Sequence, residues 1–135
     1  MAIKFSETVR NARLNAIETA IGTAAVLKLR TGSPPAAIGD PDSGVVVATM
    51  TLDSNWMADA SGGTKGKSGT WQDPGADTGG TISHFRVYAS DGVTQHIQGT
   101  VTITGNGGDM TLDNNVVEAG QQITITTFTL QDGNA

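Results

Sequence analysis

The chain has 135 residues and contains no cysteine, which excludes a disulfide and a thiolate metal site. Charged residues make up only 16% of it, and its formal net charge is −5. Affinity for nucleic acid comes largely from lysines and arginines that neutralise phosphates, so an acidic chain poor in both is a weak candidate for that role. At this length we expect a single domain, 1–135, large enough to bury a core.

Long apolar runs are also missing. No stretch approaches the length needed to cross a bilayer, so we expect no membrane partner. The first ten residues, MAIKFSETVR, have neither the apolar stretch nor the cleavage site of a signal peptide. We therefore expect the chain to be cytosolic when it is synthesised.

One helix is expected near the N-terminus, over residues 6–21. Ser6 is a suitable N-cap, Glu7 suits the positive end of the helix dipole, and Gly22 suits the position after the last turn. The apolar stripe of this helix is narrow and consists largely of alanine. The helix is therefore expected either to close one end of a β core or to pack on a neighbouring subunit.

The remainder, 24–131, is predicted to be a β domain. The chain has 18 glycines, abundant threonine and only 4% aromatic residues, a composition typical of many short strands and tight turns. Strands at 25–31 and 45–52 flank a loop too rich in proline for a central strand. A strand at 64–71 is expected to carry Lys65 and Lys67 outward. About eight strands predict an antiparallel β-sandwich or jelly-roll-like domain.

A hairpin is predicted between 81–89 and 93–99. A three-residue loop ending at Gly92 sets Phe85 opposite Ile97 and places the apolar side chains on one face. The other face is then expected to be polar and exposed, with His84, Arg86, Tyr88, Thr94, His96 and Gln98 on it.

The last strand is predicted at 121–130. Ile123 and Ile125 share one side, but Phe128 and Leu130 fall on the opposite parity. Either a bulge near Thr126 re-aims the end of the strand, or another layer or another subunit covers its second face.

Motifs for catalysis or cofactor binding are not evident. His84 and His96 are expected on one face without a third metal ligand, and no serine lies in a G-x-S-x-G turn. The acidic loops at 40–44 and 109–115 supply oxygens but lack the pattern of an EF-hand. We therefore predict that the chain is not an enzyme and holds no cofactor. The two tryptophans are expected to be core or interface anchors, or else platforms on which sugars stack: Trp56 and Trp71.

Several segments resemble a family of small structural proteins of tailed bacteriophages and prophages, and the likeness spans nearly the whole chain. These segments are TGSPPA at 31–36, NWMADASGGTKGKSGTW at 55–71, HFRVY at 84–88, HIQGTV at 96–101, GGDMTLDNN at 107–115 and the C-terminal GQQITITTFTLQDGNA. The N-terminal helix IKFSETVRNARLNAIETAIG is part of the resemblance, which brings no catalytic residues with it.

This resemblance implies a capsid decoration (cement) protein that is made in the bacterial host cytoplasm and lies on the virion surface. It would bind neighbouring copies of the major capsid protein, as a homo-oligomer and most simply as a trimer. A tail, baseplate or fibre-associated component is the alternative, and a carbohydrate-binding module is a further one. The residues expected at interfaces are Ile3, Phe5, Pro34, Pro35, Trp56, Met57, Phe128 and Leu130.

Overall fold

The computed structural model describes residues 3–133, which form one helix and ten strands. The prediction of a mainly β chain with one N-terminal helix is confirmed. The elements are α1 (Glu7–Ile21), β1 (Val26–Thr31), β2 (Val46–Thr51), β3 (Thr64–Gly66), β4 (Trp71–Asp73), β5 (Gly80–Tyr88), β6 (Gln95–Ile103), β7 (Met110–Leu112), β8 (Val116–Val117), β9 (Ile123–Ile125) and β10 (Thr129–Gln131).

The main sheet has six strands in the order β2-β1-β5-β6-β7, with β8 paired to β5. Strand β7 runs parallel to β6, so the sheet is mixed and the prediction of a purely antiparallel arrangement is wrong. Two small sheets, β4 with β9 and β10 with β3, complete the β structure. The described strands outnumber the predicted eight, partly because the segments 64–71 and 121–130 each break into two.

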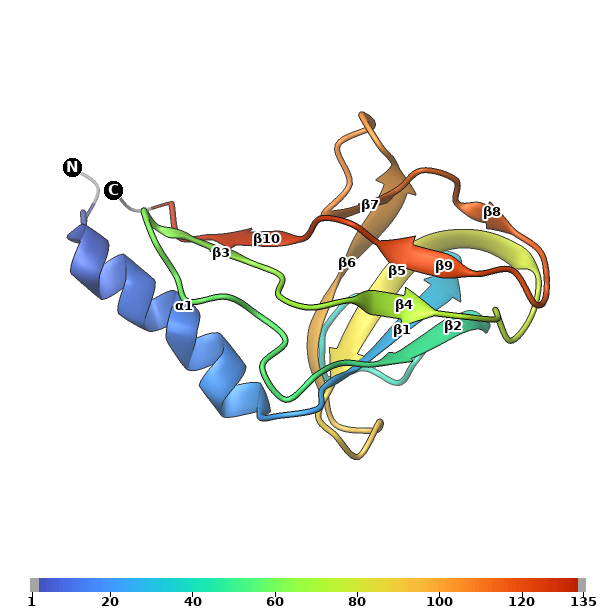
Figure 1. Cartoon of the computed structure of the whole chain (residues 1–135), viewed down its shortest axis with the longest axis horizontal. Helices are drawn as coiled ribbons and strands as arrows, with labels where there is room; N and C mark the ends of the chain where they lie inside the picture. Colours follow the sequence, from blue (N-terminus) through green and yellow to red (C-terminus); the bar gives the residue numbers. More distant parts are fainter. Residues whose placement is uncertain (1–2, 134–135) are drawn as a thin grey trace.

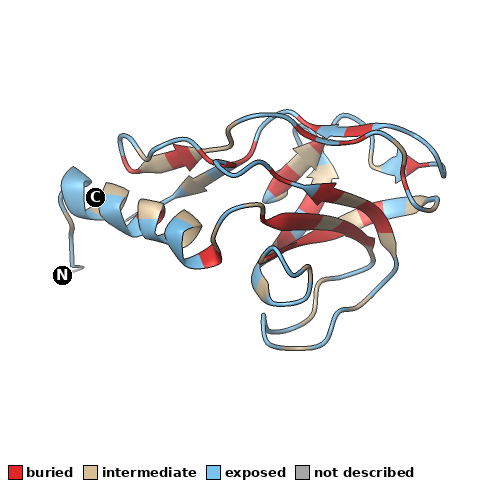
Figure 2. Cartoon of the chain, turned by 60° about the horizontal axis from the view of Figure 1, so that its bottom comes forward, coloured by how far each residue is buried: buried red, intermediate tan, exposed pale blue. Residues whose placement is uncertain are grey.

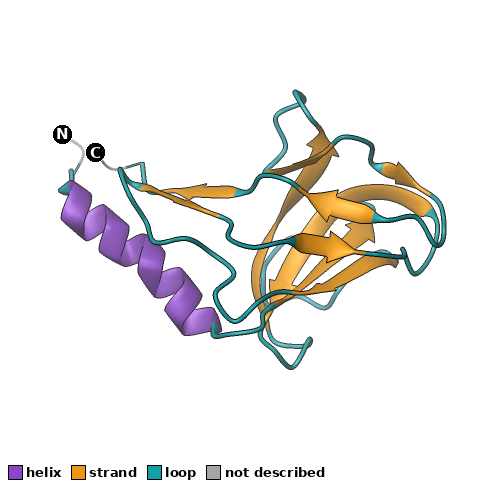
Figure 3. Ribbon diagram, in the orientation of Figure 1, coloured by secondary structure: helices purple, strands orange, loops and turns teal. Residues whose placement is uncertain are grey.

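The molecule is elongated. Figures 1 and 3 show α1, β3 and β10 together at one end, away from the main sheet. Both chain ends lie at that same end (Figure 1). We call this part, residues 3–22 with 55–66 and 128–132, the helix arm.

Local signals set the ends of α1 as the sequence predicts. The Ser6 side chain accepts a hydrogen bond from the Val9 N–H at 3.3 Å, and the Gly22 N–H donates to the Glu18 carbonyl with φ 94° at Gly22. The helix does not cap the main sheet. Only Leu14 and Ile21 of α1 are buried, and Figure 2 shows the buried residues concentrated in the strands instead.

The core lies on one face of the main sheet. Leu29 pairs with Phe85 in neighbouring strands, and Phe85 pairs with Gly99 on its other side. A Cβ at position 99 would lie 2.8 Å from the Phe85 ring, so only glycine leaves room there. The Phe128 ring then bridges Phe85 and Trp71, with 5.6 Å between ring centroids in each pair.

The predicted hairpin exists, but its register differs. Val87 pairs with Ile97 and Phe85 with Gly99, and a β-bulge follows Val87. The bulge accompanies a loop longer than expected, which the Ala89 N–H to Thr94 carbonyl hydrogen bond closes. The Asp91 carboxylate organises this loop by accepting hydrogen bonds from the Thr94 hydroxyl and N–H and from the Val93 N–H, and these lower the pKa of Asp91 to about 2.

The segment 121–130 forms two strands, so the prediction of one long strand is wrong. Strand β9 pairs with β4, and β10 pairs with β3. The change of parity near Thr126 arises because the chain passes there from one small sheet to the other, and not from a bulge within a single strand. Ile123 and Ile125 are buried against the core, and Phe128 is buried from the opposite parity.

We predict that Phe128→Ala lowers the free energy of unfolding by about 3–5 kcal/mol, because a buried ring that contacts two other rings is lost and a cavity remains. Thr129→Ala, at the exposed neighbouring position, is the matched control and should change it by less than about 0.5 kcal/mol. Urea unfolding followed by tryptophan fluorescence measures both. Equal effects of the two changes would contradict the core role of Phe128.

Candidate functional site

The structure separates the eight predicted interface residues into two groups. Ile3 is 75% exposed, and the other surface-accessible members are half-buried: Phe5, Pro34, Pro35 and Leu130. The remaining three lie inside the core: Trp56, Met57 and Phe128. The expectation that these three form an outer contact surface is wrong for this chain, because its own residues already surround them.

The two tryptophans are anchored through their polar atoms as well as their rings. Trp56 Nε1 donates to the Gly22 carbonyl at 2.9 Å, and Trp71 Nε1 donates to the Trp56 carbonyl at 3.2 Å. Their ring centroids are 6.1 Å apart. Neither ring is open to solvent, so neither offers a platform on which a sugar could stack.

The polar side of α1 holds the helix arm together, which sequence reasoning missed. Four side chains accept backbone N–H groups of residues 57–63 at 2.9–3.1 Å. They are Glu7, Asn11, Asn15 and Glu18, whose respective donors are Gly62, Gly63, Ala60 and Met57. Their spacing of four, four and three residues places them along one side of a helix, which is the signal that could have revealed them.

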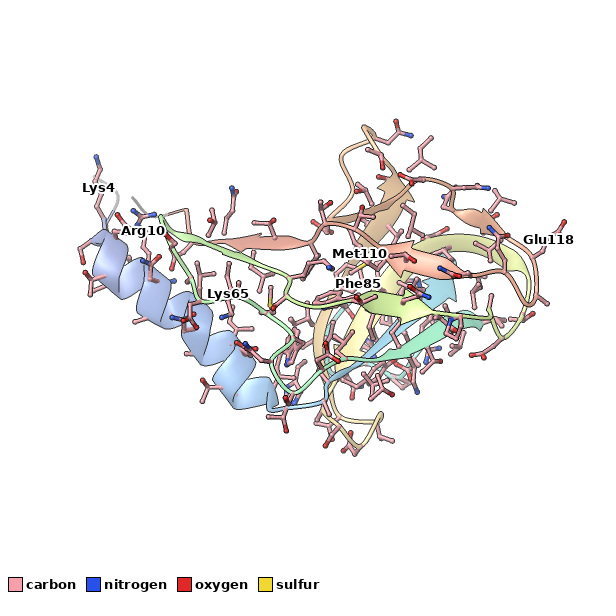
Figure 4. The ribbon with its side chains drawn as sticks, viewed as in Figure 1. Lys4, Arg10, Lys65, Phe85, Met110 and Glu118 are labelled. Carbon is pink, nitrogen blue, oxygen red and sulfur yellow. The ribbon has the colours of Figure 1, made fainter. Side chains whose placement is uncertain are left out.

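Lys65 is buried between α1 and β3 (Figure 4). The prediction that it points outward is wrong, because that side of β3 faces the helix. Its Nζ lies 3.1 Å from Glu18 Oε1 and donates to Asn15 Oδ1 and to the Ala58 carbonyl, each at 2.9 Å. Lys67 stays half-buried, with its Nζ 5.9 Å from the Trp71 ring centroid.

A second buried polar cluster lies on the face of the main sheet opposite the core. His84, Arg86 and Tyr88 were expected to be exposed there, but all three are buried. The Pro-rich loop, residues 32–44, contributes hydrogen-bond partners to all three. The Arg86 guanidinium contacts Asp42 Oδ1 at 2.9 Å, and Tyr88 Oη donates to the same oxygen at 2.7 Å.

The rest of this cluster supplies further acceptors to the two arginines. Arg86 also donates to Gln98 Oε1 at 2.8 Å and to the carbonyls of Asp40 and Ala37, which lie in the loop. Arg30, on the neighbouring strand β1, contacts Asp42 Oδ2 at 2.9 Å. One carboxylate therefore joins two guanidinium groups and a phenol. We call these four residues the loop latch: Asp42, Arg30, Arg86 and Tyr88.

The surroundings of this cluster shift the pKa values of Asp42 and His84, among others. Partial burial raises the pKa of Asp42, but the hydrogen bond from Tyr88 and the charges and hydrogen bonds of the two arginines outweigh it, so the pKa lies below 3.8. Burial lowers the pKa of His84 below 6.5, and the positive charges of Arg30 and Arg86 lower it further. The His84 Nδ1 lies 2.7 Å from the Gly32 carbonyl, whereas its Nε2 is buried with no hydrogen-bond partner among residues 3–133.

The carboxylates of the acidic loop at 40–44 are already engaged by groups of the chain itself. The Asp42 carboxylate already neutralises two arginines, and Asp40 Oδ2 accepts the Ala37 N–H at 2.9 Å. In the other acidic loop, Asp109 Oδ2 accepts the N–H and the hydroxyl of Thr100. Within the described part of the chain, no group of three or more His, Asp or Glu side chains is placed to hold a metal ion.

No protein-family model matches the chain, and searches of curated proteins and of solved structures found no similar protein. In the described residues, no helix combines the length and the apolar character required to traverse a bilayer.

We predict that acid weakens the fold through His84. The unfolded chain takes up a proton on this histidine near pH 6.5, whereas the folded chain does so only at a lower pH. Stability is therefore complete above about pH 6.5 and falls as the pH drops below it. The urea midpoint measured at about pH 7.5 and about pH 5.5 should show this fall. His84→Gln should reduce it, and His96→Gln, at an exposed position, should leave it unchanged.

We predict that Asp42→Asn lowers the free energy of unfolding by about 1.5–3 kcal/mol, because two guanidinium groups lose their counter-charge. Asp40→Asn is the matched control, since its side-chain oxygen still accepts the Ala37 N–H. Limited proteolysis should cut residues 32–44 faster in Asp42→Asn than in the control. Equal cleavage rates in the two variants would show that Asp42 does not hold the loop.

Proposed function

We propose that the chain is a structural subunit of a tailed-phage particle, and specifically a decoration protein that binds neighbouring copies of the major capsid protein. Its role in this proposal is to join subunits through surface contacts, with no bond made or broken in a substrate. The resemblance of the sequence to small phage structural proteins supports this proposal, and so does the surface of the helix arm.

The observation that carries the proposal is the exposed apolar surface of the helix arm. Ile3 is 75% exposed and Val9 is 42% exposed. Ala12 and Ala16, which share the Val9 side of the helix, are exposed as well. Short side chains let another helix or strand approach closely, and described residues of this chain leave that side open.

The arm suits docking because it is already ordered. Its four helix-to-backbone hydrogen bonds and the buried Lys65 fix the orientation of α1 before any partner binds. A preorganised surface loses less conformational freedom on association, so more of the contact energy remains as affinity. A subunit that binds only the assembled shell would then stabilise that shell by mass action.

The Pro-rich loop is the second proposed contact. Pro34 and Pro35 are half-buried on a loop that the latch holds in one conformation. A trimer placed around a three-fold axis of the shell would present three such loops and three helix arms to neighbouring capsid subunits. This symmetry is part of the proposal.

A tail, baseplate or fibre-associated role remains the alternative, since the same surfaces would serve there. The carbohydrate-binding alternative is less well supported, because it relied on Trp56 and Trp71. Both are buried, and of the six aromatic rings in the chain only that of Phe5 is not fully buried. That ring lies under the Arg13 guanidinium, 4.8 Å from its centroid.

Counting copies in purified particles tests the proposal. Quantitative mass spectrometry of the phage that encodes the chain should find copies on the order of hundreds per particle if the chain covers a symmetric head. A handful of copies, or a few rings, would indicate the tail instead. Particles that lack the chain altogether would refute a structural role.

We predict that Ile3→Ser combined with Val9→Ser lowers the occupancy of the chain on particles without changing its unfolding midpoint, because both side chains are exposed in the free chain. Val116→Ser, on β8 at the other end of the molecule (Figure 1), is the control and should bind normally. Co-sedimentation of purified chain with undecorated particles measures the occupancy. Undiminished binding of the double variant would count against the arm as the contact.

A further inference from the structure

Three groups in the helix arm have the composition of a condensation site. An amine, an amide and a carboxylate meet there: Lys65 Nζ lies 2.9 Å from Asn15 Oδ1 and 3.1 Å from Glu18 Oε1. A carbonyl bond is about 1.2 Å long, so Nζ lies within about 4 Å of the Asn15 Cγ. Lys65 is only 1% exposed, so bulk water has little access to the amine.

We propose that Lys65 and Asn15 condense to form an intramolecular isopeptide bond, with Glu18 as the proton-transfer group. The bond would join the middle of α1 to β3. This inference concerns the chain's own side chains and holds whether or not the chain binds a capsid.

The reaction balances without an oxidant, a reductant or a second substrate. Glu18 takes a proton from the Lys65 ammonium, and the free electron pair of Nζ forms a bond to Asn15 Cγ. The tetrahedral carbon then expels Nδ2, which receives two protons from Nζ through the Glu18 carboxyl group and leaves as ammonium. An amide remains between the two side chains, and the Glu18 carboxylate is regenerated.

The surroundings of the cluster fit each of these roles. The Ala60 N–H donates to Asn15 Oδ1 at 2.9 Å, where negative charge would develop during the attack. The Met57 N–H donates to the other oxygen of Glu18 at 3.1 Å and so fixes the carboxylate. Asn15 Nδ2 has no hydrogen-bond partner among residues 3–133, so nothing there retains the leaving group.

The position of the bond gives it a structural consequence. It would close a covalent loop between residues 15 and 65 in a chain that has no cysteine and therefore no disulfide. A cross-link between distant residues restricts the unfolded chain and resists separation of the parts that it joins. Here those parts are α1 and the strand pair β3–β10 of the helix arm.

Mass spectrometry of the purified full chain tests the proposal. The intact mass should lie about 17 Da below the mass calculated from the sequence, because one ammonia is lost when the amine displaces it. Trypsin does not cleave after a lysine whose amine is acylated, so a digest should contain residues 14–28 joined to residues 31–67. Folded chain in which these segments appear as separate peptides, with Lys65 cleaved normally, would overturn the proposal.

Three variants separate this bond from other losses of ammonia, such as succinimide formation at Asn106-Gly107. Lys65→Arg should keep its full calculated mass. Glu18→Gln should still fold, but its Lys65 and Asn15 should condense much more slowly or not at all. Asn11→Ala is the matched control, since Asn11 accepts a backbone N–H on the same side of α1 but does not contact Lys65, and it should still lose ammonia. Loss of the same mass from Lys65→Arg, or unchanged condensation in Glu18→Gln, would contradict the proposed chemistry.

Discussion

The guanidinium of Arg86 imposes the constraint on which the second face of the main sheet depends. A buried cation without acceptors is very unfavourable, so the chain has to bring oxygens to it. Asp42 and two loop carbonyls supply them from above, and Gln98 supplies one from the adjacent strand. The Pro-rich loop thereby becomes a covering layer of the sheet although it contributes little apolar surface. This is why β1 and β5 are buried on both faces.

The helix arm follows the same principle with different groups. Its hydrophobic contacts are few, since only Leu14 and Ile21 of α1 are buried. Side-chain oxygens of the helix instead accept backbone N–H groups of residues 57–63. Two of these donors belong to the buried residues Met57 and Gly63, where an unsatisfied N–H would be costly. Glu18 and Asn15 each serve both a backbone donor and Lys65, so the loss of either would leave the lysine and a peptide group unsatisfied together.

Local signals in the sequence were sufficient for the helix ends and the proline-rich loop, because each depends on a few neighbouring residues. Burial of polar residues was not predictable in this way. Arg86 meets Asp42 across 44 positions, and Lys65 meets Asn15 across 50. Strand alternation assigns a side chain to a face but does not say what covers that face. The hairpin register failed for a related reason, since one bulge shifts every pair beyond it.

The loop latch and the polar contacts of the helix arm also determine which side chains remain exposed to other molecules. Both tryptophans, Tyr88 and the cations of these two clusters are buried. These groups therefore form neither a stack of exposed rings nor a basic patch on the surface. Other exposed apolar residues, such as Val93 and Val116, lie on separate loops or strands, as on most soluble proteins. By contrast, Val9 and the exposed alanines lie on α1 itself, and Ile3 lies just before it. Hydrogen bonds on the polar side of α1 fix the orientation of this helix. The polar contacts beneath the helix therefore hold its exposed side, with Val9, Ala12 and Ala16, in a fixed orientation, and this is the surface that the proposed docking uses.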